Sequence, residues 1–304
     1  MLVWVPLDAV ARALDGIAGA EVVVVDPDGG ATLPPSAAEV EFYVPPLFPR
    51  PPAIAALSAM PRLKVVQTLT AGIDLLLPHV PAGAVLCNAH GIHDTSTAEW
   101  VVAATLASVR EFGYYAAEQA AGRWSTRFTG ALADQTVLIV GYGSIGEAVE
   151  RRLAGFDVRI LRVARTARDG VHPVADLPGL LPEADVVILL APVTRDTVGL
   201  ADARFLAAMK NGALLVNGAR GALVVTDDLC AELASGRLRA ALDVTAPEPL
   251  PPGHPLWTLQ NALITPHAAA TTWLSATAAL GFLGAQLRRY LAGMPLQNVV
   301  TGEY

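Results

Sequence analysis

The sequence predicts an α/β protein with two doubly wound parallel sheets. Apolar, β-branched runs alternate along the 304 residues with stretches of helical period, which is typical of parallel strands joined through helices. Runs such as TVLIV and VVILL are apolar at every position, as in strands buried on both faces. A long helical stretch separates two sets of these runs, and a chain of this length has room for two cores. We therefore expect two lobes with a cleft between them.

The predicted strands lie in two sets, one on either side of the separating helix. The first set covers residues 2–7, 21–26, 41–44, 64–69 and 84–88, and the second covers 136–140, 157–163, 185–190, 213–217, 239–244 and 262–265. The separating helix is predicted over residues 95–122, with Thr95 or Ser96 as its N-cap and Glu99 in its first turn. Shorter helical patterns at 145–155, 202–209 and 226–236 connect strands of the second set.

Charge, cysteine content and hydropathy exclude several classes of protein. The net charge of −7 argues against nucleic-acid binding, which needs a basic face. Two distant cysteines, Cys87 and Cys230, make no disulfide framework and indicate a reducing, cytoplasmic setting. The uncharged segment 249–287 is interrupted by prolines, and its last part, 271–287, is shorter than the roughly 20 residues of a membrane span. We expect that part to be a buried helix and the protein to have no membrane segment.

A glycine-rich turn lies between a predicted strand and a predicted helix. The stretch TVLIVGYGSIGEAVERRL places Gly141, Gly143 and Gly146 there. In such a turn the first glycine makes the tight bend, the second lets the backbone approach a pyrophosphate, and the third lets helix and strand pack closely. The helix start presents N–H groups and a positive dipole to the phosphates. The pattern predicts a dinucleotide site at these glycines together with Ser144 and Ile145.

Arginines stand at every third position of the next strand and the loop after it: Arg159, Arg162, Arg165 and Arg168. At the end of this strand a site for NAD has an acidic residue, which bonds the ribose hydroxyls and repels a 2′-phosphate. This chain has Ala164 there, followed by Arg165 and Thr166. Arg165 can bind a phosphate through two charge-assisted hydrogen bonds, with Arg162 or Arg168 as a second contact. We expect NADP(H), with NAD(H) as the weaker alternative; otherwise these arginines are solvated or paired with surface acids.

Three reactive side chains follow at the ends of later strands. LLVNGARG (214–221), ALDVTAPEP (241–249) and ITPHAAATT (264–272) carry Arg220, Glu248 and His267. Reduction of a ketone needs a cation to hold the substrate carboxylate, an imidazole to supply a proton, and a carboxylate to orient the imidazole. Each residue alone has a structural explanation, but all three downstream of a dinucleotide turn favour catalysis.

The order and spacing of GYGSIG, APVTRDTVGL, LLVNGARG, LDVTAPEP, HPLW and ITPH resemble the D-isomer-specific 2-hydroxyacid dehydrogenase family. TLTAGID (68–74) and TAEWVVAATLASVR (97–110) extend the resemblance over nearly the whole chain. It implies two Rossmann-like lobes: a substrate lobe from residues 1–94 plus 271–304, and an inserted dinucleotide lobe from residues 95–270. It also implies a homodimer formed through the dinucleotide lobes.

Site residues are carried over position by position. The resemblance implies His267 as the acid/base, Glu248 as its partner and Arg220 as the substrate anchor. It also implies that backbone N–H groups of Ala71 and Gly72 hold the substrate carboxylate.

The remaining positions concern the cofactor. The resemblance implies that Asp243 contacts the nicotinamide amide and that Pro192 and Thr197 line the cofactor. Ala164 departs from the Asp of NAD-using members and fits the NADP-using branch that reduces glyoxylate or hydroxypyruvate, so a small 2-keto acid and its 2-hydroxy acid are the expected partners. No cysteine and histidine spacing suggests a metal.

Two other functions stay open. One is oxidation of a different small anion, such as phosphite or formate, on the same scaffold. The other is dinucleotide sensing without turnover, against which the three reactive residues weigh. We assign Trp257 to packing at a loop, whereas Trp124 and Trp273 either close the substrate pocket or pack in the core or an interface.

Overall fold

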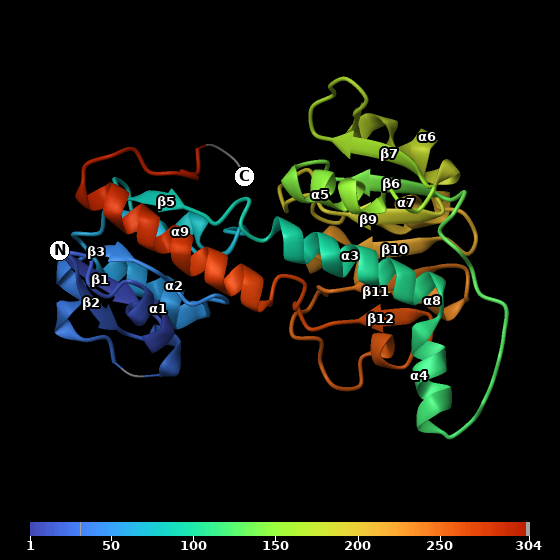
Figure 1. Cartoon of the computed structure of the whole chain (residues 1–304), viewed down its shortest axis with the longest axis horizontal. Helices are drawn as coiled ribbons and strands as arrows, with labels where there is room; N and C mark the ends of the chain where they lie inside the picture. The colour runs from blue at the N-terminus through green and yellow to red at the C-terminus, as the bar shows by residue number, and fades with distance from the viewer. Residues whose placement is uncertain (31, 302–304) are drawn as a thin grey trace. The chain divides into compact units, whose positions relative to one another are not determined.

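The computed structural model describes residues 1–30 and 32–301, which form two compact α/β units. One unit comprises Met1–His93 and the segment from Trp273 onward, and the other comprises Asp94–Thr272. Each is built on a parallel sheet, of five strands in the first and seven in the second (Figure 1). The predicted fold class is therefore confirmed. The assignment of substrate and dinucleotide binding to the two lobes stays a prediction.

The five-stranded sheet has the order β2-β1-β3-β4-β5. Its strands are β1 (Leu2–Val5), β2 (Glu21–Val24), β3 (Val40–Tyr43), β4 (Val65–Gln67) and β5 (Val85–Cys87). Val3 and Val5 pack on one face with α1 (Asp8–Ala13) and α9 (Trp273–Leu291). Trp4 points to the opposite face, where the segment that begins with α2 (Pro51–Ala55) covers it. Strict alternation along β1 thus buries both faces, as a doubly wound sheet requires.

The seven-stranded sheet has the order β12-β11-β10-β9-β6-β7-β8. Its strands are β6 (Thr136–Val140), β7 (Arg159–Ala164), β8 (His172–Pro173), β9 (Val186–Leu189), β10 (Leu214–Asn217), β11 (Arg239–Leu242) and β12 (Ala262–Ile264). Its helices are α3 (Asp94–Val109), α4 (Phe112–Ala120), α5 (Ser144–Leu153), α6 (Leu177–Leu180), α7 (Ala203–Ala208) and α8 (Thr226–Ala234). Helices α3 and α5 cover one face, and α6, α7 and α8 cover the other. The strand order reverses between β6 and β9, which makes their carboxyl ends the topological switch point.

The single helix expected over residues 95–122 is wrong: two helices, α3 and α4, occupy this stretch. The chain turns at Glu111, whose φ of 55° lies in the left-handed region and cannot continue a right-handed helix. The carboxylate of Glu111 forms an ion pair with Arg127 beyond α4. The predicted N-cap is also displaced, because α3 begins at Asp94 and the Ser96 hydroxyl bonds that of Thr272 at 2.7 Å.

Helix α9 departs from the buried helix expected over residues 271–287. Its buried residues, among them Ala279, Leu283 and Leu287, lie on one face, while Trp273 at its start is 91% exposed. Part of the apolar composition therefore lies on the exposed face of the helix, which carries Trp273, Leu274, Ala276, Gly281 and Ala285. In the part of the chain that the structure describes, no helix has the length and apolar character needed to cross a membrane.

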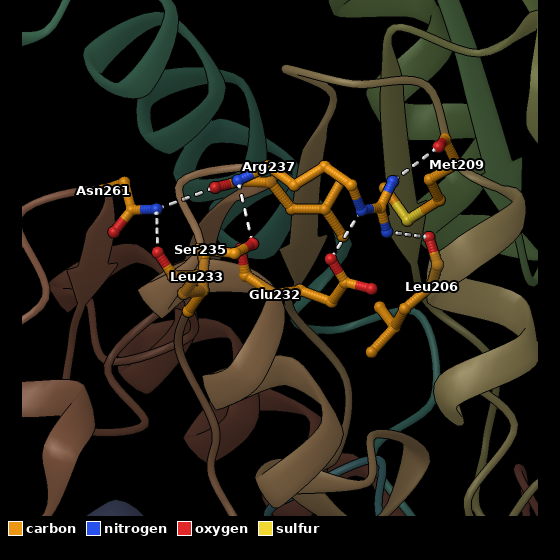
Figure 2. A network of polar contacts seen from close by, with 8 residues as sticks. Leu206, Met209, Glu232, Leu233, Ser235, Arg237 and Asn261 are labelled. Carbon is orange, nitrogen blue, oxygen red and sulfur yellow. Dashed lines mark hydrogen bonds and ion pairs between the residues drawn. The ribbon is translucent and has the colours of Figure 1, made fainter.

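A network of polar contacts centred on Arg237 connects α7 with α8, as Figure 2 shows. Arg237, just after α8, donates to the carbonyl oxygens of Leu206 and Met209 at 2.6 and 2.9 Å and to the Glu232 carboxylate at 2.5 Å. The two carbonyls lie at the C-terminal end of α7, where the helix dipole favours a cation. Asn261 binds the carbonyl of Leu233 on the other side of the same turn at 2.9 Å. The network fixes the start of β11, which ends at the catalytic candidates.

Candidate active site

The glycine turn lies at the switch point of the seven-stranded sheet. Gly141 follows β6 with φ of 101°, and a Cβ placed on it would lie 2.3 Å from the backbone N of Ala191, just after β9. A Cβ on Gly146 would lie 3.0 Å from the carbonyl oxygen of Gly141. Gly143 is different, because its Cβ position has no atom within 4 Å. The first and third glycines thus serve backbone packing, and the second leaves open space beside the start of α5.

Tyr142, within this turn, connects it to the arginine-rich strand. The N–H groups of Gly141 and Tyr142 both donate to the carbonyl of Val163 at 2.9 Å. The Tyr142 hydroxyl donates to Glu150 on α5 at 2.5 Å. Its ring centroid lies 5.7 Å from the guanidinium of Arg162 and 5.5 Å from that of Arg168, within cation–π range. Sequence reasoning did not single out Tyr142 or Glu150, because neither position belongs to the glycine pattern.

The four arginines fall into two groups, two that are ion-paired and two that are not. Arg159 forms an ion pair with Glu183 at 2.8 Å, and Arg162 donates from Nε to Glu150 at 2.7 Å and also pairs through Nη2. The bond from Arg162 lowers the pKa of Glu150 and raises that of Arg162. In the described part of the chain, Arg165 and Arg168 form no ion pair, and Arg168 donates to the Tyr142 carbonyl at 2.7 Å. Two guanidinium charges therefore stay uncompensated after β7, beside Ala164 and the exposed Thr166.

The loop after β9 holds two further predicted residues together. The hydroxyl of Thr197 donates to the carbonyl of Pro192 at 2.6 Å and accepts from the N–H of Thr194 at 2.7 Å. This closes the loop on itself next to Ala191, which contacts Gly141. Ser144 and Ile145 stand in the first turn of α5, on the other side of the same switch point.

Arg220 lies in the turn after β10. Its Nη1 donates to the carbonyl of Ala219 at 2.8 Å, and its own carbonyl accepts from the Asn217 side chain at 2.8 Å. The next residue must be glycine, because a Cβ on Gly221 would lie 2.0 Å from the carbonyl oxygen of Thr245. The Arg220 turn thus rests directly on the backbone of the loop that carries Glu248.

Glu248 and His267 are in direct contact. The Glu248 Oε1 lies 2.6 Å from Nδ1 of His267. Because a carboxylate only accepts, Nδ1 carries the hydrogen of this bond, and Nε2 is the ring nitrogen that does not face Glu248. His267 has a φ of 52°, an uncommon conformation for a residue with a side chain.

Asp243, at the end of β11, holds the His267 turn in this conformation. Its carboxylate is 2% exposed and accepts from the Thr265 hydroxyl at 2.5 Å and the N–H groups of Ala268 and Ala269 at 2.8 and 2.9 Å. Its carbonyl accepts from the N–H of His267 at 2.7 Å. Three neutral donors thus satisfy the buried charge. The predicted contact of Asp243 with a nicotinamide amide stays a prediction.

The other unit contains Ala71 and Gly72, in the loop after β4. Both are half-exposed, and the carbonyl of Ala71 accepts from the Asn88 side chain at 3.0 Å. Two of the tryptophans considered from the sequence lie outside the cores: Trp124 is fully exposed and Trp273 is 91% exposed. Core packing is therefore wrong for both. Trp257 donates from its indole to the carbonyl of Pro251 at 3.0 Å, which fits its predicted packing at a loop.

A glycine turn at a switch point, with uncompensated arginines after the second strand, is typical of proteins that bind a dinucleotide. Comparisons with known proteins agree with this class. A family model described as D-isomer specific 2-hydroxyacid dehydrogenase, NAD binding domain, matches residues 102–269. A mouse protein named glyoxylate reductase/hydroxypyruvate reductase is 37% identical over 228 residues, which is 69% of each chain. A glyoxylate reductase of Thermofilum pendens is 35% identical over 231 residues, 71% of this chain and 68% of its own.

Solved structures extend the likeness over the whole chain. An NADPH-dependent glyoxylate/hydroxypyruvate reductase of Sinorhizobium meliloti, in complex with NADP and sulfate, has a TM-score of 0.83 at 30% identity over 98% of both chains. A D-isomer specific 2-hydroxyacid dehydrogenase of Xanthobacter autotrophicus, in complex with NADPH, has a TM-score of 0.82 at 30% identity over 99% of this chain and 98% of its own. The chain belongs to the D-isomer specific 2-hydroxyacid dehydrogenase family.

Alanine should mainly lower stability at Gly141 and mainly weaken dinucleotide binding at Gly143. In Gly141→Ala the Cβ meets the Ala191 backbone at positive φ, so we expect the free energy of unfolding to fall by roughly 1–3 kcal/mol. In Gly143→Ala the Cβ meets no protein atom, so stability should change by less than about 0.5 kcal/mol. The same Cβ occupies the space left for the pyrophosphate and should weaken dinucleotide binding by about tenfold or more.

Urea unfolding and fluorescence titration with reduced dinucleotide measure the two effects. Equal loss of stability in both variants would contradict the separate roles of the two glycines. Unchanged dinucleotide affinity in Gly143→Ala would remove the pyrophosphate from this position.

Proposed function

We propose that the protein transfers a hydride from NADPH to a small 2-keto acid, of the glyoxylate or hydroxypyruvate type, and releases the 2-hydroxy acid, as the D isomer where a chiral centre is formed. The observation that carries the proposal is the contact of 2.6 Å between Glu248 and Nδ1 of His267 within the unit that has the glycine turn. Relatives named as glyoxylate reductases, and a similar structure named NADPH-dependent, support the substrate and the cofactor. They do not favour oxidation of phosphite or formate, or dinucleotide sensing without turnover.

His267 is the acid that completes the reduction. The Glu248 carboxylate holds Nδ1–H, so the protonated imidazole presents Nε2–H to the carbonyl oxygen of the substrate. NADPH supplies the hydride when it is bound. The negative charge of Glu248 stabilises the imidazolium before the proton leaves and fixes the ring orientation throughout. Asp243 supports this geometry from behind through the backbone N–H groups that follow His267.

Arg220 binds the substrate carboxylate and polarises the carbonyl group. A guanidinium suits this role because its parallel N–H groups match a carboxylate. Backbone N–H groups of Ala71 and Gly72 bind the same carboxylate in this proposal. The close backbone packing of Gly221 on Thr245 supports a fixed spacing between Arg220 and Glu248.

NADP(H) is held by groups around the switch point. Gly143 offers the pyrophosphate an open approach to the start of α5, with Ser144, Ile145 and Gly146 in its first turn. Arg165 and Arg168 bind the 2′-phosphate, helped by Thr166, because no carboxylate in the described chain neutralises them and Ala164 carries no charge. Arg162 is excluded from this role by its pairing with Glu150. The nicotinamide half of the cofactor is lined by Asp243 and by the loop that Pro192 and Thr197 close.

A homodimer formed through the dinucleotide unit is part of the proposal. Trp124 and Phe128 are fully exposed in the segment after α4, and Phe112 on α4 is largely exposed. Such clustered aromatic side chains are typical of interfaces. Light scattering should give the mass of two chains. We also infer a cytoplasmic location, which the two unpaired cysteines support.

Replacement of His267 should remove turnover and spare cofactor binding. We expect His267→Asn to lower kcat by about 10² or more, the usual scale for loss of an acid/base, and to leave the Kd of NADPH unchanged. His172→Asn is the control, because His172 also bonds a carboxylate, that of Asp176 at 3.0 Å, on the surface. Steady-state reduction of glyoxylate measures the effect. Near-wild-type turnover of His267→Asn would remove this residue from catalysis.

Replacement of the unpaired arginines should change the cofactor preference. Arg165→Ala should lower kcat/KM for NADPH by about 10- to 100-fold, the worth of one or two charge-assisted hydrogen bonds, with little effect on NADH. Arg168→Ala should act in the same direction. Arg159→Ala is the matched control, because Arg159 is paired with Glu183. An unchanged ratio of the two cofactors' kcat/KM in Arg165→Ala would contradict the phosphate assignment.

A further inference from the structure

The loop after β4 has an unusual hydrogen-bond pattern. Every backbone carbonyl from residue 68 to residue 72 accepts a hydrogen bond. Two of the donors are side chains in or next to the loop itself, and three lie in the segment that follows β5. The five donors, in the order of the carbonyls, are Gln67 Nε2 at 2.9 Å, His93 Nε2 at 2.7 Å, the Ala89 N–H at 2.9 Å, Asn88 Nδ2 at 3.0 Å and Thr70 Oγ1 at 2.9 Å. The Thr68 hydroxyl adds a second bond to the Thr70 carbonyl at 2.8 Å.

The donors that reach back to the loop are buried. Gln67 is 0%, Asn88 4% and His93 9% exposed, whereas Thr70, Ala71 and Gly72 are half-exposed. Gln67 is itself held by Gln286 of α9, which donates to its Oε1 at 2.9 Å. The carbonyl oxygens of residues 68, 69 and 71, which these donors bind, therefore point toward the interior of this unit.

Because the peptides are planar and trans, the directions of the carbonyls determine the directions of the N–H groups. In each peptide the N–H points opposite to the carbonyl of the preceding residue. His93 holds the Leu69 carbonyl and so directs the Thr70 N–H outward; Asn88 holds the Ala71 carbonyl and so directs the Gly72 N–H outward. Among residues 1–30 and 32–301, the N–H groups of Thr70 and Gly72 have no acceptor. Successive outward N–H groups of this kind form a site for an anion.

His93 is the donor with the most defined chemistry. Its Nε2 must carry the hydrogen, because the Leu69 carbonyl can only accept. Its Nδ1 is buried and has no hydrogen-bond partner within the described chain. The Nε2–H group of the ring is thus used in the bond to the loop.

We propose that His93 and Asn88 are positioning residues for substrate binding. They hold the carbonyls of the 68–72 loop inward, so that its N–H groups are presented to the carboxylate of the 2-keto acid before the substrate arrives. The inference rests on the proposed function, which assigns that carboxylate to the N–H groups of Ala71 and Gly72, and it adds the neighbouring N–H group of Thr70, which His93 directs outward. Neither residue touches the substrate; each acts through a peptide group of the loop.

The test compares two variants of His93 with a control at His90. His93→Leu removes the donor, whereas His93→Gln places an amide N–H at the position of Nε2 and should restore it. His90→Leu is the control, because His90 lies in the same segment with an exposed side chain. We expect His93→Leu to raise KM for glyoxylate and the Kd of oxamate, a non-reacting carboxylate, by about tenfold. The Kd of NADPH should stay within about twofold, and His93→Gln and His90→Leu should resemble the wild type.

A general loss of structure would give a different result. It would lower the melting temperature, weaken NADPH binding and reduce kcat together, without recovery in His93→Gln, and this outcome would overturn the positioning role. An unchanged oxamate Kd in His93→Leu would overturn it as well. If His93→Leu does not fold, Asn88→Ser carries the same expectation for KM and oxamate.

Failure of the proposed function gives a separate signature. A wild-type protein that reduces no 2-keto acid would contradict that function. The positioning role would then be judged by calorimetry with oxamate on the NADPH complex, which needs no turnover: weaker binding in His93→Leu than in His93→Gln supports it, and equal binding overturns it.

Discussion

Backbone-to-backbone contact at the carboxyl ends of the parallel strands is the constraint on which the proposed site depends. Gly141 lies against Ala191 at the switch point, and Gly221 lies against Thr245 between the turns of Arg220 and Glu248. At both places a side chain would overlap main-chain atoms, so the loops can approach only because glycine is present. These contacts set the spacing of the groups that we assign to cofactor binding and catalysis, before any side chain is considered.

The charged residues around the proposed site differ in whether other groups of the protein already satisfy them. Asp243 is buried but receives three hydrogen bonds, so its negative charge serves to hold the His267 turn. Arg162 is charged but neutralised by Glu150, so it serves the packing around Tyr142. Arg165 and Arg168 differ from these, because they have no carboxylate partner among the residues that the structure describes. The partners of a charged residue thus indicate whether it serves the structure or can bind a ligand, and the residue type alone does not.

The sequence was sufficient for the fold class, the glycine turn and eleven of the twelve strands that the structure describes, because these depend on local periodicity and on a short pattern. The two-residue strand β8 was not predicted. The sequence also placed Glu248 and His267 at strand ends, which parallel topology then brings together. It was not sufficient for the break at Glu111, where a left-handed residue interrupts a helical pattern, or for the pairing of Arg162 with Glu150. The sequence also did not indicate that Asn88 and His93 donate hydrogen bonds to the 68–72 loop. Hydrogen bonds between residues about 20 positions apart leave no periodic signal.

The most direct test of the proposed activity is oxidation of reduced nicotinamide by the wild-type protein, followed by absorbance with glyoxylate or hydroxypyruvate as substrate. NADPH and NADH are compared at equal concentration. The account predicts that NADPH is oxidised with kcat/KM at least about tenfold above that of NADH, and that the product is a D-2-hydroxy acid where the substrate gives a chiral centre. Preference for NADH would contradict the role of Arg165. Binding of NADPH without reduction of any 2-keto acid would contradict the proposed function itself.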